Sequence, residues 1–212
     1  MSDFRRVFSM AVMALLLTRP APAQTKAKPA APPSPAPPME AVVETEKGSF
    51  VIGLLDDLAP RHVAHFVATA KKAGYDGTTF HRIIPRGIIQ GGDPLSKDPA
   101  RKSLYGTGGL SQKAPWLLKA ELSDRPMARG SVAAVLLPGK PDSAGSQFFI
   151  CLADQLSLTG KYTIFGEVTS GMEVVDAIGE TPVEGDKAQT RVEMKKVTVR
   201  EARPAPAGVV AP

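Results

Sequence analysis

Reactive side chains are scarce in this sequence. Its 212 residues include one cysteine, three histidines and one tryptophan. One cysteine cannot form a disulfide within the chain, and Cys151 stands in the apolar run QFFICLA, where we expect a buried, unreactive thiol rather than a nucleophile. Three histidines without a convincing serine or cysteine partner give little support to a hydrolytic triad.

Metal and phosphate motifs are equally sparse. His62 and His65 stand three residues apart, but no third ligand follows at a useful spacing, so we expect histidines on a helix surface rather than a metal site. The GTGG run at residues 106–109 lacks the lysine and the strand-to-helix context of a phosphate-binding loop, and it predicts a tight, exposed turn. Asp56 and Asp57 precede an expected helix, where they favour its positive end rather than acid-base chemistry. The sequence therefore predicts neither a metal nor a cofactor.

A basic patch large enough for nucleic acid is also missing. The formal net charge is +5, but residues 1–28 hold five basic residues and one acidic residue. From Met39 onward the net charge is therefore only about +1. Such a balance argues against a nucleic-acid partner despite the pI near 9.4.

The two ends of the chain differ in composition from its middle. Arg5 and Arg6, the apolar run over residues 7–17 and the Ala21-Pro22-Ala23 site are typical of a secretory signal peptide over residues 1–23. An uncleaved membrane anchor is the alternative, but the apolar run is shorter than the ~20 residues that span a bilayer. We expect an exported protein, periplasmic or secreted, without stable membrane insertion. Residues 24–38 read as a Pro/Ala-rich linker and residues 203–212 as a disordered tail.

Residues 39–202 hold the pattern of one domain rich in strands. A hairpin is predicted around Lys47 and Gly48, because β-branched and apolar residues flank them on both sides. One helix is predicted over 60–72, with Pro60 in its first turn and Gly74 as its stop, and a second from Ser170 to Gly179, with a capping box to Glu173. Further strands are expected over 78–84, 88–90, 131–136, 146–152, 163–168 and 192–199. Short strands without crossover helices favour an antiparallel sheet or barrel.

Strand alternation gathers polar side chains on common faces. On this basis Arg82 shares a face with Phe80 and Ile84, because successive residues of a strand point to opposite sides. The same alternation pairs Gln147 with Phe149, and Ile88 with Gln90. One groove could thus hold one cation, two amides and apolar side chains, without an acid or a nucleophile.

Four stretches together resemble the cyclophilins, which are peptidyl-prolyl cis/trans isomerases. They are YDGTTFHRIIPRGIIQGGDP, GTGG, PDSAGSQFFI and GKYTIFGEVTSGMEVVDAI, in the family's order and across nearly the whole domain. The resemblance implies a closed eight-stranded antiparallel β-barrel capped by two α-helices, with the active groove on its outer surface. It implies a monomer that needs no metal or cofactor and acts on Xaa-Pro bonds of unfolded or folding polypeptides. By matching position it makes Arg82 and Gln90 catalytic, and the substrate-binding residues are His81, Ile88, Gly106, Val135, Gln147, Phe149, Leu158 and Tyr162.

The chain also departs from the family pattern. Gly87 stands where the family usually has Phe, and Ser157 where it usually has Trp or another large apolar residue. Ala134-Val135-Leu136 replaces the usual far wall of the groove, and the segment from Pro94 to Tyr105 is longer than usual. Two hypotheses therefore stand: an isomerase, or a proline-peptide-binding or chaperone module with low turnover. For Arg82 itself, the alternative to catalysis is a structural ion pair on a surface strand.

Overall fold

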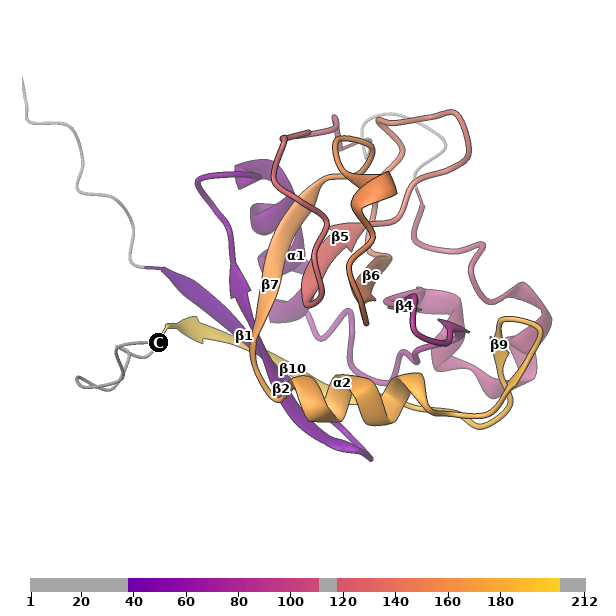
Figure 1. Cartoon of the computed structure of the whole chain (residues 1–212). Coiled ribbons are helices and arrows are strands. Elements are labelled where there is room, and N and C mark those ends of the chain that lie inside the picture. Colours follow the sequence, from indigo (N-terminus) through magenta and orange to yellow (C-terminus); the bar gives the residue numbers. More distant parts are fainter. Residues whose placement is uncertain (1–37, 111–117, 203–212) are drawn as a thin grey trace, which may run out of the picture. The chain divides into compact units, whose positions relative to one another are not determined.

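The computed structural model describes residues 38–110 and 118–202, which form a domain built mainly from short strands (Figure 1). The predicted signal peptide, the predicted linker up to residue 37 and the predicted tail lie outside the described residues. The strands are β1 (Met39–Thr45), β2 (Gly48–Leu54), β3 (Arg82–Ile84), β4 (Ile88–Gly91), β5 (Ser131–Ala134), β6 (Phe148–Cys151), β7 (Ile164–Ser170), β8 (Val183–Glu184), β9 (Lys187–Ala188) and β10 (Met194–Glu201). The helices are α1 (Pro60–Lys71) and α2 (Met172–Gly179), with 3-10 turns η1 (Pro94–Lys97), η2 (Pro99–Leu104) and η3 (Leu156–Leu158).

All strand pairs among the described residues are antiparallel and belong to one sheet. Its order is β10-β1-β2-β7-β5-β6-β4-β3-β9-β8. A mainly β fold is confirmed, but a closed eight-stranded barrel is not, because ten strands follow one another in an open order. The two additional strands, β8 and β9, form a two-residue hairpin whose turn contains Gly185 in the left-handed region (φ 64°). Such short strands carry no apolar alternation, so no period-2 pattern indicated them.

Outside the strand ladders, backbone hydrogen bonds join residues 78–80, just before β3, to residues 192–194 at the start of β10. Phe80 N donates to Val192 O at 2.9 Å, and Met194 N donates to Thr78 O at 2.8 Å. Residues 78–81 are therefore not part of β3, which begins at Arg82, although the sequence predicted one strand over 78–84. These bonds fix the backbone immediately before Arg82.

Helix α1 begins close to its predicted position. Pro60 occupies the first turn, and the buried face includes Val63, Phe66 and Ala70. The helix ends at Lys71, and Gly74 N donates to Thr69 O at 2.8 Å. A Cβ at Gly74 would lie 2.6 Å from Thr69 Cγ2, so glycine is required for this close approach.

The amino end of α1 is held by a carboxylate from a distant segment. Glu121 accepts hydrogen bonds from the backbone N–H of Arg61 and of His62, and it contacts His62 Nδ1 at 2.6 Å. Burial alone would raise the pKa of Glu121, but the hydrogen bonds from His62 and Arg61 lower it to about 2. The His62 side chain is only 3% exposed. The expectation that it lies on a helix surface is therefore wrong. Its partner comes from 59 residues further along the chain, which no local pattern reveals.

Helix α2 begins after β7 without the predicted capping box. Ser170 is the last residue of β7, and Gly171, with φ 79°, occupies the cap position without a side-chain hydrogen bond. A Cβ at Gly171 would lie 2.7 Å from the backbone of Phe50 and Ser49, so the close approach to β2 selects glycine over a capping side chain. The two helices pack on different strands, α1 against β10 and β7 and α2 against β2 and β4 (Figure 1).

Two apolar clusters make up the core of the described residues. In the larger one, Phe66 packs on Tyr75 and Phe165 with ring centroids 4.8 and 5.4 Å apart. The smaller cluster contains Met127 from the loop before β5 and buried side chains of β4, β5, β6 and β7, which are Ile88, Ala133, Phe149, Cys151 and Ile164. Cys151 is fully buried, and burial raises its pKa to about 12, as expected for an unreactive thiol. Within residues 38–110 and 118–202, no helix has the length and apolar character needed to cross a membrane.

Candidate active site

A cavity of about 540 Å³ opens beside β3, β4 and β6. Its walls come from these strands, from residues 135–138 after β5, and from two segments made mainly of turns and loops, residues 99–110 and 186–191, which we call the irregular segments. Every predicted site residue except Gln147 lines it: Arg82, Gln90, His81, Ile88, Gly106, Val135, Phe149, Leu158 and Tyr162. The fold thus brings together side chains that span residues 81 to 162 of the sequence.

Arg82 is held from two sides at the wall of this cavity. Its Nε donates to Asp186 Oδ2 at 2.6 Å, and its Nη1 donates to Gln90 Oε1 at 3.2 Å. The hydrogen bond from Arg82 lowers the pKa of Asp186. Both side chains of this ion pair are well exposed, at 39% and 47%, so solvent screening limits the pair to about 0–1 kcal/mol of stability. Arg82 therefore lines the cavity and forms an ion pair at the same time.

A chain of amides fixes the direction of the Gln90 side chain. Gln90 Nε2 donates to Gln147 Oε1 at 2.9 Å, and Gln147 Nε2 donates in turn to the backbone oxygens of Gly106 and Gly108. Because both amide nitrogens are used in this way, Gln90 presents its oxygen to Arg82. Gln147 is 1% exposed and is not among the residues that line the cavity, so its role as a substrate-binding residue stays a prediction. It lies behind Gln90 and orients it.

Apolar side chains make up one half of the cavity, which we call the apolar half. They are Ile88, Val135, Phe149, Leu158 and Tyr162. The Phe149 and Tyr162 rings meet edge to face, with centroids 5.3 Å apart and an interplanar angle of 89°. The smaller core cluster lies directly beneath, because Phe149 and Ile88 belong to it. A rigid apolar floor of this kind can hold a ring-sized apolar group.

His81 lies next to Arg82 on the cavity wall. Both side chains line the cavity although they are consecutive, because β3 begins only at Arg82 and strand alternation does not hold before it. Phe80 is fully buried in the larger core cluster, so the prediction that it shares a face with Arg82 is wrong. His81 is 7% exposed, its Nε2 has no hydrogen-bond partner among the described residues, and burial lowers its pKa. A neutral imidazole thus faces the cavity at pH 7.

The other half of the cavity, which we call the polar half, was not predicted. It is lined by Pro99, Lys102, Tyr105, Thr107, Asp186, Lys187, Gln189, Thr190 and Arg191. The extra length before GTGG was visible in the sequence, but nothing there placed it at the groove. Asp186, the ion-pair partner of Arg82, lies 104 residues further along the chain and gave no sequence signal.

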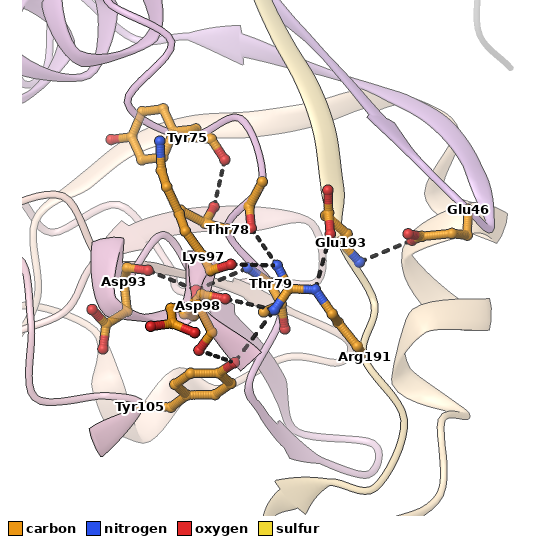
Figure 2. Close-up of polar contacts among 12 residues, drawn as sticks. Glu46, Tyr75, Thr78, Thr79, Asp93, Lys97, Asp98, Tyr105, Arg191 and Glu193 are labelled. Carbon is orange, nitrogen blue, oxygen red and sulfur yellow. Dashed lines mark hydrogen bonds and ion pairs between the residues drawn. The ribbon is translucent and has the colours of Figure 1, made fainter. Parts of the chain in front are cut away.

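Arg191 joins the two irregular segments of the polar half (Figure 2). Its Nη1 donates to Ser96 O at 2.6 Å and to Tyr105 Oη at 3.3 Å, and its Nε pairs with Glu193 at 2.9 Å. Its Nη2 donates to the backbone oxygen of Gly77. Hydrogen bonds from a charged group to neutral acceptors contribute about 1.5–3 kcal/mol each. Arg191 is therefore the central anchor of residues 94–105, the longer segment before GTGG, which we call the inserted segment.

Asp93 secures the same segment at both of its ends. Its carboxylate is fully buried and accepts from Leu95 N at 2.8 Å, from Gly106 N at 2.6 Å and from Gly108 N at 3.2 Å. A Cβ at Gly108 would lie 2.3 Å from Asp93 Oδ1, so only glycine fits there. The GTGG run forms the predicted turn, but Gly106 is half-buried and lines the cavity rather than being fully exposed.

Comparison with known proteins relates this geometry to one family. A family model described as cyclophilin type peptidyl-prolyl cis-trans isomerase/CLD matches residues 41–199. The peptidyl-prolyl cis-trans isomerase-like 1 protein of Rhizopus delemar is 40% identical over 140 residues, which are 66% of this chain and 79% of that protein. A probable peptidyl-prolyl cis-trans isomerase of Brucella suis is 39% identical over 143 residues, covering 65% of this chain and 69% of its own length.

Solved structures show the same likeness. A crystal structure of a Cryptosporidium parvum cyclophilin type peptidyl-prolyl cis-trans isomerase matches with a TM-score of 0.69 and 26% identity, over 79% of this chain and 99% of that one. A second structure of that protein, in the presence of the dipeptide Ala-Pro, matches with a TM-score of 0.68 over 77% of this chain and 99% of that one.

Proposed function

The chain belongs to the cyclophilin-type peptidyl-prolyl cis-trans isomerase family, and we propose that its cavity accelerates rotation of Xaa-Pro peptide bonds with Arg82 as the catalytic cation. The observation that carries this assignment is the position of Arg82 between the apolar half and the amide chain, where Gln90 and Asp186 hold its guanidinium.

The chemistry requires no covalent intermediate. Rotation about an Xaa-Pro bond costs about 18–20 kcal/mol because amide resonance is lost. In the twisted state the proline nitrogen regains a lone pair, which a guanidinium N–H can bind better than it binds either planar amide. A barrier lowered by ~7 kcal/mol corresponds to about five decades in rate.

The cavity supplies a cationic donor for the twisted amide and an apolar floor for the proline ring. Arg82 uses Nε and one Nη1 hydrogen for Asp186 and Gln90, so its Nη2 group has no protein partner among the described residues and can donate to substrate. Phe149 would grip the proline ring on the apolar floor while the preceding carbonyl turns. Because Gln90 and Asp186 already fix the guanidinium, little reorganisation accompanies the reaction.

The substrates in this proposal are unfolded or folding polypeptides with exposed Xaa-Pro bonds, bound by a monomer. The solved relative in the presence of Ala-Pro supports a proline-containing ligand. We further propose that the protein is exported, because residues 1–23 carry a basic start, a short apolar run and an Ala-Pro-Ala site. Mass spectrometry of exported protein should find a chain that starts near Gln24, and an intact Met1 would contradict export by cleavage.

NMR exchange spectroscopy on an Ala-Pro peptide tests the activity directly. Catalytic amounts of the full chain should broaden or exchange the cis and trans signals, which interconvert in tens of seconds or longer without catalysis. A protease-coupled assay on the same peptide provides an independent rate. Binding of the peptide without faster exchange would contradict the isomerase and support the low-turnover binding module.

A further inference from the structure

The polar half of the cavity carries more positive than negative charge. Asp186, the acid in its lining, pairs with Arg82, and Glu193, two residues beyond the lining residue Arg191, pairs with that arginine. Lys102 and Lys187, both exposed, have no carboxylate partner among the described residues. Two ammonium groups without a carboxylate partner in the described part of the chain therefore border the cavity beside Arg82.

Lys187 is in direct register with Arg82. The two residues are Cα partners in the antiparallel β3–β9 pair, and both side chains line the cavity. Side chains directly opposite in such a pair lie about 4.5–5.5 Å apart at Cβ, where like charges are destabilising. Asp186 pairs with Arg82, and Glu184, the residue opposite Lys187 on β8, forms no ion pair with it, so the charge of Lys187 is available to another partner.

Lys102 approaches the same place from the inserted segment. It lies on η2, whose amino end is capped by Asp98, and its Nζ donates to Gln189 O at 3.4 Å. Gln189 is two residues beyond Lys187 in the chain. The ammonium of Lys102 thus reaches across to the segment that carries Lys187, and Arg191 holds the two segments together.

We propose that Lys102 and Lys187 bind a carboxylate side chain of the substrate, so the cavity prefers Xaa-Pro segments with Asp or Glu close to the proline. This inference rests on the proposed isomerase function. An extended peptide advances about 3.3 Å per residue, so a neighbour of the proline bound on the apolar half can reach the polar half. Lysine suits this role because its ammonium is a compact charge on a flexible stem that can follow a carboxylate.

The first test compares Ala-Pro peptides that carry Glu, Gln or Lys at the second residue before the proline or at the first residue after it. At low salt, kcat/KM for a Glu peptide should exceed that for the Gln peptide by about two- to fivefold for each lysine engaged, and the Lys peptide should be poorest. Added NaCl at about 1 M should remove most of the preference, because it shortens the Debye length to ~3 Å. Equal kcat/KM for the three peptides at both positions would overturn the inference.

The second test reverses the charges of the two lysines. The double variant Lys102→Glu with Lys187→Glu should invert the order, so that the Lys peptide becomes better than the Glu peptide. The control, Lys47→Glu with Lys195→Glu, makes the same change in net charge at exposed positions outside the cavity lining and should keep the original order. An inversion in both variants would assign the preference to net charge, and no inversion in either would exclude the two lysines; both results overturn the inference.

The neutral Gln peptide separates this inference from the proposed function. If the full chain accelerates exchange of the Gln peptide but shows no charge preference, only the carboxylate site is refuted. If no peptide is accelerated, the isomerase function itself fails.

Discussion

Two paired strands carry the floor of the apolar half, whereas the polar half is carried by segments with little strand pairing. Ile88 and Phe149 lie on β4 and β6, which are hydrogen-bonded neighbours, and a buried cluster supports them from below. Lys102 and Tyr105, by contrast, belong to 3-10 turns and loops that side chains hold in place. The two halves face one cavity but are stabilised by different interactions.

This difference assigns the two halves different tasks. A floor fixed by strand ladders and core packing suits the chemical step, which depends on placing Arg82 against a twisted amide. A wall fixed by Arg191 and Asp93 can change in length and charge without disturbing that floor. Catalysis should therefore depend on the first half and the choice of substrate on the second.

Removing Arg82 should have the largest effect on turnover. Arg82→Ala is expected to lower kcat/KM on an Ala-Pro peptide by about a hundredfold or more, as loss of one preorganised donor to a transition state does. Its melting temperature should change little, because the exposed ion pair with Asp186 adds at most about 1 kcal/mol.

The neighbouring Arg86 provides the matched control for Arg82. It is exposed at the bend before β4 and does not line the cavity, so Arg86→Ala should keep nearly full activity. Near-normal kcat/KM in Arg82→Ala would refute the mechanism. A large fall in its melting temperature would favour the structural ion pair instead.

The residues around the apolar half also predict how tightly the protein binds cyclosporin, a drug that many members of this family bind. Ser157 is exposed on η3, and Gly87 offers no side chain, so two large contact surfaces are missing. We expect weak inhibition, about a thousandfold below that of family members with both aromatic residues, allowing for non-additivity. Ser157→Trp should tighten binding by about ten- to thirtyfold, measured by drug titration against activity, whereas Ser157→Ala should not. Nanomolar inhibition of the natural sequence would show that Leu158 or the inserted segment supplies the missing wall.

Strand alternation indicated Ile88 and Phe149 of the apolar half, whereas Leu158 and Tyr162 came only from the resemblance to the family. The alternation of Ile88 and Gln90 on β4 holds in the structure, and both line the cavity. The same rule misplaced Phe80, because the backbone before Arg82 pairs with residues 192–194 rather than continuing β3. Alternation is informative only within a regular strand, and the ends of strands depend on tertiary contacts.

Features formed by distant side chains could not be predicted from the sequence. Asp186 and Gln147 bind Arg82 and Gln90 across 104 and 57 residues, and Glu121 contacts the buried His62 across 59 residues. The capping box predicted at Ser170 is absent for a related reason. The close approach of β2 requires glycine at the cap position, which Gly171 occupies. Local patterns thus predicted the two helices and eight of the ten strands in the described residues, while the network that orients the site required the structure.

Removing the hydrogen bonds that hold the polar half in place should lower the stability of the protein and leave its turnover nearly unchanged. Arg191→Met removes the donors to Ser96, Tyr105 and Gly77, so we expect a loss of about 3 kcal/mol or more in the free energy of unfolding and faster hydrogen exchange over residues 94–105. Exchange of a neutral Ala-Pro peptide should slow by no more than about threefold. Arg101→Met is the control in the same segment, because its exposed pair with Asp98 contributes at most about 1 kcal/mol. A hundredfold loss of turnover in Arg191→Met would show that the two halves are not separable.

The smallest expected effect is the response of turnover to pH, which depends on His81 where the two halves meet. Burial lowers the pKa of His81 below its usual 6.5, so the imidazole stays neutral from pH 6.5 to 8, and kcat/KM should vary by less than about twofold in that window. Because the folded pKa is lowered, the neutral ring contributes stability that is present above about pH 6.5 and is lost as the pH falls through the folded value. Rates and unfolding curves measured side by side from pH 5 to 8, for the natural chain and for His81→Gln, separate these effects. A steep change in kcat/KM between pH 6.5 and 8 that His81→Gln abolishes would show a titrating imidazole in the cavity and contradict the neutral ring.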